Sequence, residues 1–247
     1  MKPALRFCGR SHRGLVRDGN EDAWAAVPGR GLFIVSDGVA GQLGGEVASQ
    51  IVVQAFPPLL EKRLAGEKDL TGRQARGCVV AALSELSIQV RKETKDQLGL
   101  DGMGATVVLA LVKGRHALIA HMGDSRCYRM RDGRLEQITK DHSMLQLLLD
   151  AGEIAPEEVA DHPAKGQLTR YVGMAGDPLP EAKTIKLRKN ERLVLCSDGL
   201  TNMLPDDDIA RICTENAEPA GGCGSAAGGA SEASGAGDIA AAVRALP

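Results

Sequence analysis

Two Asp-Gly pairs, each directly after a run of apolar residues, are the part of this sequence whose residue types and positions point most clearly to chemistry. They are Asp37-Gly38 and Asp198-Gly199. A strand that ends in Asp-Gly places a carboxylate at the rim of a sheet, and the glycine lets the backbone turn so that its carbonyl oxygen comes within reach of an ion. One such pair alone is more simply a turn, as we expect for Asp132-Gly133. The repetition favours a cradle for hard cations.

A third acidic element precedes the strand hairpin that delivers Asp37. It is Asn20-Glu21-Asp22, and its position suggests that Glu21 lies opposite Asp37 across the hairpin. Arg17 stands four residues before Glu21, and a guanidinium beside bound cations offers the planar fork that grips phosphate oxygens. The alternative for Arg17 is a surface ion pair with a neighbouring carboxylate. The combination indicates phosphoryl chemistry more than ion storage.

A fourth cluster, Gly123-Asp124-Ser125-Arg126, follows another predicted strand and again puts acidic and basic side chains at a strand end. All-oxygen ligands favour magnesium or manganese, because no His/Cys set with the spacing typical of zinc accompanies them. Two such ions that share a carboxylate can generate hydroxide at neutral pH and neutralise the charge that develops during in-line attack on phosphorus. The chemistry then requires no protein nucleophile.

The elements that must position these residues are predicted from apolar periodicity. Strand and helix patterns are segregated along the chain, which predicts an α+β layered sandwich. We expect strands at 22–27, 31–36, 106–112, 116–121, 127–130, 184–187, 192–197 and 239–246, and helices at 45–60, 71–97, 143–151, 156–160 and 205–213. The Ala/Gly/Ser-rich stretch 217–237 has the composition of a flexible linker. We expect one domain over 1–247.

The bulk composition excludes several function classes. The chain of 247 residues has 43% apolar and 25% charged residues and a net charge of −2, so it offers no field for polyanions. Aromatic residues make up 2%, which argues against nucleic-acid binding. The first residues lack the apolar core of a signal peptide and no stretch is long enough to span a bilayer, so we expect a cytoplasmic protein without a membrane partner. We expect its six cysteines to be thiols.

Taken in order, these motifs resemble the type 2C protein phosphatases, the metal-dependent Ser/Thr phosphatase family, and in particular its compact bacterial members. The resemblance covers about residues 5 to 215, and its Asp-Gly and Gly-Asp-Ser-Arg blocks are the most specific parts. The matching stretches are 17–22, 36–41 with 45–49, 102–106, 123–126, 133–143, 168–170 and 197–200.

The resemblance implies a four-layer αββα sandwich, in which two antiparallel β-sheets pack face to face and are flanked by helices. It implies two Mn²⁺ or Mg²⁺ ions with a water between them that attacks the phosphate. Asp37 would bridge the ions, Glu21 and the Gly38 carbonyl would complete the protein ligands of one, and Asp198 would bind the other. Asp124, with Asp198, matches positions that help bind a third, weaker ion in bacterial relatives. Arg17 would hold the substrate phosphate, and 171–181 would be the flap that varies substrate access.

The sequence departs from the family pattern at three places. The family usually ends with Gly-x-Asp-Asn, whose Asp is a further ligand of the ion held by Asp198. Asp238 is the candidate here, followed by Ile239 instead of Asn. Ala40 and Gln42 replace a usual glycine and a common histidine. The general acid of eukaryotic members has no counterpart, so a metal-bound water, His12 or His142 would protonate the leaving group.

The leading hypothesis is a protein serine/threonine phosphatase that acts on phosphorylated proteins, including a bacterial Ser/Thr kinase and its substrates, as a monomer. The main alternative is a non-catalytic or conditionally active phosphatase-like regulator, because the C-terminal metal motif is altered. A metallohydrolase for nucleotides or sugar phosphates is disfavoured, since the sequence has no Gly-rich loop ending in Gly-Lys-Ser/Thr and no aromatic cluster for a base.

Overall fold

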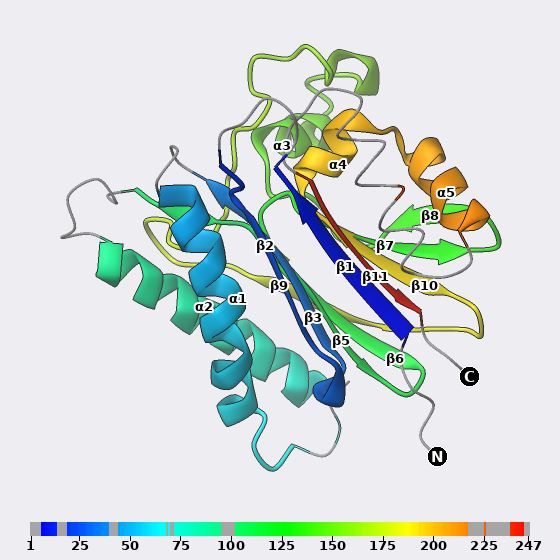
Figure 1. The fold of residues 1–247 in the computed structure, drawn as a ribbon. Coiled ribbons are helices and arrows are strands. Elements are labelled where there is room, and N and C mark those ends of the chain that lie inside the picture. The colour runs from blue at the N-terminus through cyan, green and yellow to red at the C-terminus, as the bar shows by residue number, and fades with distance from the viewer. Residues whose placement is uncertain are drawn as a thin grey trace.

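Two antiparallel sheets form the centre of the computed structural model, which describes residues 6–13, 19–39, 44–67, 69, 72–94, 102–216, 225 and 238–244 (Figure 1). The first sheet has, in order, β1 (Arg6–His12), β11 (Asp238–Arg244), β10 (Arg192–Cys196), β7 (Arg126–Arg131) and β8 (Arg134–Gln137). The second has β2 (Asp22–Val27), β3 (Leu32–Val39), β5 (Val107–Lys113), β6 (His116–Met122) and β9 (Glu181–Lys186), with the short β4 (Gly104–Ala105) paired to β3. The antiparallel sheets of the sequence prediction are confirmed.

Helices cover the outer face of each sheet. Contacts of the second sheet are with α1 (Gly44–Arg63) and α2 (Arg73–Thr94), and those of the first are with α4 (Asp198–Met203) and α5 (Asp206–Glu215). The remaining helices are α3 (Met144–Ala151) and two short 3-10 turns, η1 (Pro28–Arg30) and η2 (Pro156–Glu158). The order helix, sheet, sheet, helix is the predicted four-layer sandwich.

Strand β3 shows why a continuous apolar run precedes the first Asp-Gly pair. Successive side chains of a strand point to opposite faces of the sheet. Leu32 and Ile34 face the core under the helices, whereas Phe33 and Val35 face the core between the two sheets. A strand buried on both faces needs apolar residues at every position, and only its end can carry Asp37.

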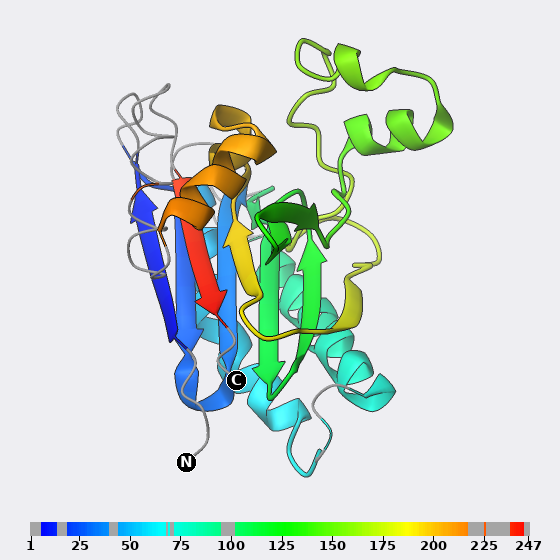
Figure 2. The same ribbon diagram turned by 90° about the vertical axis from the view of Figure 1, so that its right-hand side faces the viewer.

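One segment, residues 144–167, stands off from the two sheets, and we call it the projecting segment (Figure 2). It begins with α3, whose N-cap residue Ser143 accepts a hydrogen bond from the Gln146 amide at 3.2 Å. The flap is expected at 171–181, and the structure holds the start of that stretch against the sandwich. Val172 in that stretch is fully buried and exchanges backbone hydrogen bonds with Ala105, so this part of the chain is tied to the sandwich.

Most predicted elements are present within a few residues. The predicted last strand is β11, and it lies between β1 and β10, inside the first sheet. Helix α4 was missed, because Asp198-Gly199 was interpreted as a turn. Within the predicted linker 217–237, the described part of the chain contains only Ser225.

Two further expectations concern the cysteines and the membrane. Cys78, Cys127, Cys196 and Cys213 are free thiols, as expected, but Cys8 on β1 is disulfide-bonded, which corrects the prediction for that residue. No helix in the part of the chain that the structure describes has both the length and the hydropathy to cross a membrane.

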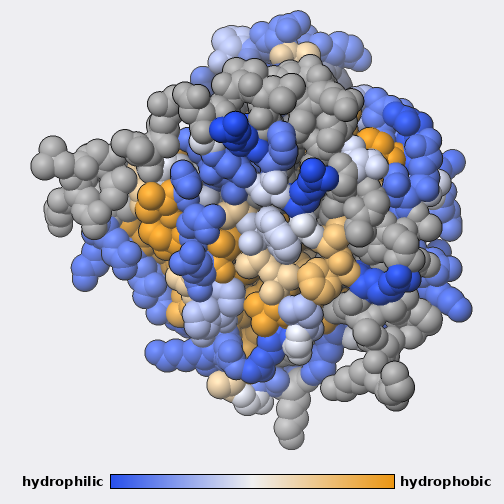
Figure 3. Space-filling model, in the orientation of Figure 1, coloured by the Kyte–Doolittle hydropathy of each residue, from blue (hydrophilic) through white to orange (hydrophobic). Residues whose placement is uncertain are grey.

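The face in Figure 3 is mostly hydrophilic, with hydrophobic side chains gathered over α1. Val47 on α1 is one of the exposed large apolar residues. Such an exposed apolar side chain is ordinary on a protein surface.

Candidate metal centre

Three strand termini bring three aspartates together at one end of the sandwich. Asp22 begins β2 and pairs directly with Asp37 at the end of β3, and Asp198 follows the end of β10 in the other sheet. The side chain of Asp37 contacts the carboxyl groups of both Asp22 and Asp198. The sequence analysis expected Glu21 opposite Asp37, but the hairpin register puts Asp22 there. The Glu21 carbonyl instead accepts a hydrogen bond from the Gly38 amide at 3.0 Å.

Asp37 is held in an environment that disfavours its charge. Burial, followed by the neighbouring charges of Asp22 and Asp198, raises the pKa of Asp37 well above its usual range. Its backbone is fixed by Thr106, whose hydroxyl accepts from the Asp37 amide at 3.0 Å and whose amide donates to the Asp37 carbonyl at 2.8 Å. Carboxylates crowded in this way are stabilised when a cation lies between them.

Asp22 is itself buried and receives a hydrogen bond from the other sheet. The Ser197 hydroxyl donates to Asp22 Oδ2 at 2.8 Å. Ser197 stands at the N-cap position of α4, yet its side chain makes no capping bond, because the hydroxyl is directed to Asp22 instead. This bond ties the start of β2 to the end of β10, so it positions two of the three aspartates relative to each other.

The backbone around Gly38 leaves no room for a side chain. A Cβ atom at Gly38 would lie 2.1 Å from the Gly45 carbonyl oxygen, and a Cβ at Gly45 would lie 3.0 Å from Glu21 Oε1. Only glycine permits this close approach of β3 and the start of α1. The Glu21 carboxylate therefore lies beside Gly45, and Gly38 also packs against Gly45. This places Glu21 close to Gly38, an arrangement compatible with the prediction that the two residues share a cation.

Asp198 lies in the first turn of α4. A carboxylate there is stabilised by the positive end of the helix dipole. Asn202, one turn later, donates to Asp198 Oδ2 at 3.1 Å, so the helix also orients this side chain. Of the two predicted Asp-Gly sites, the second is therefore a helix start and not a turn.

Asp124 lies near the same carboxylates. Burial, then the charges of Asp198 and Asp141, raises the pKa of Asp124 to about 7. Asp124 and Asp198 both line a groove of about 640 Å³ between the projecting segment and α4. The groove also has apolar walls, among them Leu145, Leu149 and Val159. The predicted fourth cluster thus belongs to the acidic end of the sandwich.

Arg126, the basic member of that cluster, is held by protein groups. Its guanidinium donates to both carboxylate oxygens of Asp141, at 3.0 and 2.7 Å, and to the Tyr128 hydroxyl at 3.0 Å. Such a bidentate pair stabilises the loop after β8. Arg126 therefore has a structural role in this conformation.

Some predicted residues lie outside the described part of the chain. These are Arg17, Ala40 and Gln42. Asp238 is described in its backbone alone: it begins β11 opposite His12 of β1. Its strand runs beside β10, which ends just before Ser197.

Of the two histidines considered as general acids, His142 is buried beside the turn that carries Asp124. Burial, then the neighbouring His121 and Arg170, lowers the pKa of His142 to about 4. A ring with that pKa carries almost no extra proton at neutral pH, so it is a poor general acid.

Three residues with a part in this site were missed by the sequence analysis: Asp22, Thr106 and Ser197. Asp22 stands next to Glu21 in the predicted acidic element, but its pairing with Asp37 depends on a hairpin register that no local pattern fixes. Thr106 and Ser197 lie in the stretches 102–106 and 197–200 that match the family, but the sequence does not indicate their hydrogen-bond partners. Their roles depend on contacts between segments that are 69 and 175 residues apart in sequence.

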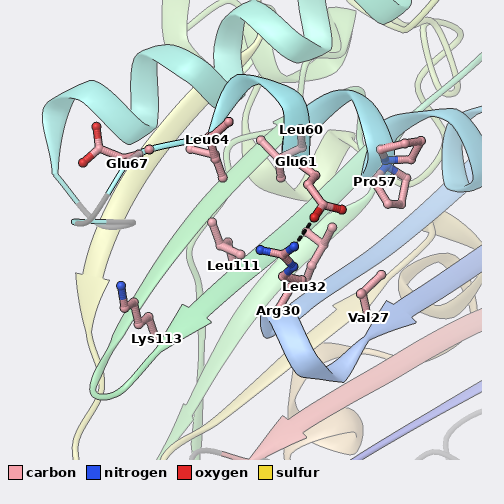
Figure 4. Close-up of a pocket in the computed structure, with 13 residues that line it drawn as sticks. Val27, Arg30, Leu32, Pro57, Leu60, Glu61, Leu64, Glu67, Leu111 and Lys113 are labelled. Carbon is pink, nitrogen blue, oxygen red and sulfur yellow. Dashed lines mark hydrogen bonds and ion pairs between the residues drawn. The ribbon is translucent and has the colours of Figure 1, made fainter.

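A second hollow, of about 610 Å³, lies at the other end of β3 (Figure 4). It is lined by apolar residues such as Leu32, Leu60 and Leu111, and an ion pair between Arg30 and Glu61 crosses it. Leu32 is five residues from Asp37, about 17 Å along a strand. This hollow is therefore separate from the acidic cluster.

The donor set of the acidic cluster fits hard divalent cations. It consists of the carboxylates of Glu21, Asp22, Asp37 and Asp198 and the backbone next to Gly38, all of them oxygen donors. Burial and the neighbouring aspartates raise the pKa of Asp37 well above its usual range, so a cation bound between these carboxylates would stabilise them. A Cβ at Gly45 would fill the space beside Glu21, and a Cβ at Gly38 would meet the backbone of Gly45. Magnesium or manganese suits such a site.

Comparisons with known proteins agree with this geometry. The family model described as protein phosphatase 2C matches residues 8–228. The serine/threonine protein phosphatase PstP of Mycobacterium tuberculosis is 39% identical over 206 residues, which are 83% of this chain and 38% of that protein, so the chain spans well under half of this relative's length. The serine/threonine phosphatase stp of Listeria welshimeri is 32% identical over 82% of this chain and 81% of its own.

A solved structure shows the same fold. The catalytic domain of PstP in complex with two manganese ions is 33% identical, covers 97% of this chain and 98% of its own, and superposes with a TM-score of 0.77. The fold described above therefore has a counterpart in a protein that binds manganese.

Proposed function

The chain belongs to the protein phosphatase 2C family, and from that premise we propose that it is a metal-dependent protein serine/threonine phosphatase, which hydrolyses phosphoserine and phosphothreonine in other proteins. The observation that carries the proposal is the contact of Asp37 with Asp22 and Asp198, carboxylates from three strand ends in two sheets. Such a concentration of negative charge destabilises the fold unless cations offset it, so it indicates a metal site.

In this proposal the cations are two Mn²⁺ or Mg²⁺ ions. Glu21, Asp37 and the carbonyl of Gly38 hold one, and Asp37 and Asp198 hold the other, with Asp238 as a further ligand. When bound, the cations activate water for attack on phosphorus and offset the charge that develops there. Asp124, together with Asp198, holds a third, weaker ion. Manganese is supported by the PstP structure with two manganese ions.

The protein's own groups orient and bind. Arg17 is proposed to grip the phosphate oxygens with its planar guanidinium. Thr106 and Ser197 fix the backbone of Asp37 and the carboxylate of Asp22 through the bonds given above, so that the oxygens do not reorganise during the reaction. The groove beside Asp124 and Asp198 offers space for the peptide that flanks the phosphorylated residue.

The proposed substrates are phosphorylated proteins, including a Ser/Thr kinase and its own substrates. The names of the relatives support protein substrates. The proposal has the whole chain acting as one monomeric domain in the cytoplasm. The non-catalytic alternative is not favoured, because the relatives are named as phosphatases.

The test is release of inorganic phosphate from a phosphothreonine peptide. We expect release with millimolar Mn²⁺, none after chelation, and none from the Asp198→Ala variant. A nucleotide and a sugar phosphate serve as competing substrates, and we expect slower turnover of both. Absence of phosphate release at millimolar Mn²⁺ from a folded wild-type chain would contradict the proposal and favour a regulatory protein.

A further inference from the structure

The projecting segment is joined to the sandwich at a narrow base formed by its two ends. Ser143 and Leu168 form an isolated antiparallel bridge. Next to it, the Thr169 amide donates to the His142 carbonyl at 2.8 Å. The groove beside the acidic cluster has this segment as one wall, so the position of the base sets the position of that wall.

His142, at this base, is bound on one side to the turn that carries Asp124. Its amide donates to the Gly123 carbonyl at 3.0 Å, and the Gly123 amide donates to His142 Nδ1 at 3.3 Å. The turn has little freedom of its own: Gly123 has φ +108°, and a Cβ there would lie 2.6 Å from the Thr106 side chain. The His142 ring is thus a direct support of the residue that precedes Asp124.

On its other side the same ring faces an ion pair. Arg170 Nη1 donates to Glu181 Oε1 at 2.9 Å, and His142 Nε2 lies 3.4 Å from that oxygen and 3.3 Å from Arg170 Nη1. The ring also stacks on His121, with centroids 4.4 Å apart and planes 21° apart. Since Arg170 lies just after the base of the projecting segment, two residues beyond Leu168, and Glu181 begins β9, this pair ties the base to the second sheet.

A metal ion is a poor explanation of this cluster, although ligand atoms of His121, His142 and Glu181 lie within 4.8 Å of one another. The Gly123 amide donates to Nδ1 of His142, so the neutral ring carries its proton on Nε2, the nitrogen that a metal would need. His121 likewise uses Nε2 for the Lys140 carbonyl, at 2.7 Å. The guanidinium of Arg170 already supplies the positive charge beside Glu181.

We infer that His142 is a positioning residue that couples the base of the projecting segment to the Gly123–Asp124 turn, so that cation binding at Asp124 and the position of the groove wall depend on each other. The inference rests on the proposed function in taking Asp124 as a cation ligand. Linkage requires the dependence to act in both directions: a cation at Asp124 stabilises the segment, and a loosened segment weakens cation binding.

Two substitutions separate the two contacts of the ring. Asparagine places its amide oxygen near the position of Nδ1, so His142→Asn keeps an acceptor for Gly123 and loses the reach to Glu181. Glutamine places a polar group near Nε2, so His142→Gln keeps that reach and loses the acceptor. A third variant, Glu181→Gln, removes a charge at a half-exposed position. It provides the test if a change of the buried His142 prevents folding.

The first measurement is amide hydrogen exchange of the metal-free chain. In His142→Gln we expect the Gly123 amide to exchange roughly 3- to 10-fold faster, because one hydrogen bond is lost. In His142→Asn we expect this amide to exchange as in the wild type. Unchanged Gly123 exchange in His142→Gln would overturn the inference. This measurement uses the metal-free chain, so its result does not depend on whether the proposed function is correct.

The second measurement adds Mn²⁺ alone, with affinity from calorimetry and exchange of the projecting segment as readouts. We expect Mn²⁺ to slow exchange in the wild-type segment, and to do so less in all three variants, with the weaker Mn²⁺ site loosened at least about fivefold. The matched control is His162→Asn, because His162 Nδ1 also accepts a backbone amide, that of Ala164 at 3.1 Å, away from the turn.

The outcomes separate the two ideas. Wild-type behaviour of Glu181→Gln and both His142 variants toward Mn²⁺ would overturn the coupling. Failure of the wild type to bind any Mn²⁺ would overturn the proposed function.

Discussion

Asp37 is the residue on which the electrostatics of this protein concentrate. Burial, and then the two carboxyl groups that touch its side chain, raise the pKa of Asp37 well above its usual range. Without cations, the folded state holds a proton at Asp37 at a pH at which the unfolded chain releases it. Because the folded pKa is the higher one, this group's contribution to stability is complete below its unfolded pKa and is lost as the pH rises through the folded pKa. The residue proposed to bind both cations thus lowers the stability of the metal-free fold.

Asp37→Asn is expected to change activity and stability in opposite directions. The amide has the same shape but no charge, so the metal-free variant should melt at a higher temperature than the metal-free wild type at pH 7.5. Phosphopeptide hydrolysis with Mn²⁺ should fall by more than about 100-fold. This loss is larger than the loss caused by removing a residue that only hydrogen-bonds to a metal ligand. Thermal melts in chelator and phosphate release measure the two effects. If Asp37→Asn melted at a lower temperature than the wild type in chelator, the explanation by repulsion between the carboxylates would be refuted.

The lowered pKa of His142 predicts how the free energy of unfolding depends on pH. Its folded pKa of about 4 lies below the ordinary 6.5, because of burial and then the nearby His121 and Arg170, with Glu181 opposing them. A lowered histidine pKa means that the unfolded chain takes up the proton first as the pH falls. Stability should therefore be complete above about pH 6.5 and fall toward pH 4, by up to about 3 kcal/mol. Denaturant unfolding at several pH values, compared between the wild type and His142→Gln, measures this difference. Equal pH dependence of the two proteins would contradict it.

At the scale of single elements, the end of β3 and the start of α1 determine whether Glu21 and Gly38 can share a cation. The two segments touch through backbone atoms at Gly38 and Gly45, a contact that any side chain would prevent. Along its length, β3 packs apolar residues into two cores, and its last residues lie at the rim of the sheet. The strand β3 therefore contributes to the packing of the core and also positions the residues of the site.

A pair of glycine substitutions tests this contact. Gly38→Ala should destabilise the protein by about 3 kcal/mol or more and weaken Mn²⁺ binding, because the new Cβ would meet backbone that cannot move aside. Gly77→Ala is the control: Gly77 is exposed within α2 with open space around it, so alanine should stabilise by roughly 0.5–1 kcal/mol. Unfolding in urea measures both. Similar small effects at the two positions would contradict the close approach.

At the scale of the whole molecule, the site joins the two sheets. Asp22 and Asp37 come from one sheet and Asp198 from the end of the other, with the Ser197 to Asp22 hydrogen bond between them. A cation bound there acts as a cross-link between the sheets. Its binding energy is then added to the free energy of folding.

Mn²⁺ is accordingly expected to raise the melting temperature. Free Mn²⁺ at about 100 times Kd adds about 2.7 kcal/mol for one site, which is roughly 5–10 °C for a chain of this size. Differential scanning fluorimetry across a Mn²⁺ series, with Asp198→Ala as the control, measures the shift. The variant should shift less. An equal shift in both proteins would place the stabilising ion elsewhere.

The sequence by itself determined most of the local structure and the kind of chemistry. Apolar periodicity predicted the strand and helix order, and the two Asp-Gly pairs after apolar runs predicted oxygen ligands at a sheet rim. The prediction of strands and helices succeeds because burial on one or both faces of an element restricts its residues in a pattern that is visible in the chain. The two Asp-Gly pairs look alike in sequence, yet one ends a strand and the other starts α4.

Only the tertiary structure decided which acidic residues meet. A hairpin register that differs by one residue exchanges Glu21 for Asp22 opposite Asp37, and no local pattern fixes that register. Thr106 and Ser197 become positioning residues through hydrogen bonds that span 69 and 175 residues of sequence. The stretch expected to be the flap, 171–181, is likewise tied to the sandwich by the pairing of Val172 with Ala105 of β4. Contacts between distant segments are set by the packing of whole sheets, which single residues do not encode.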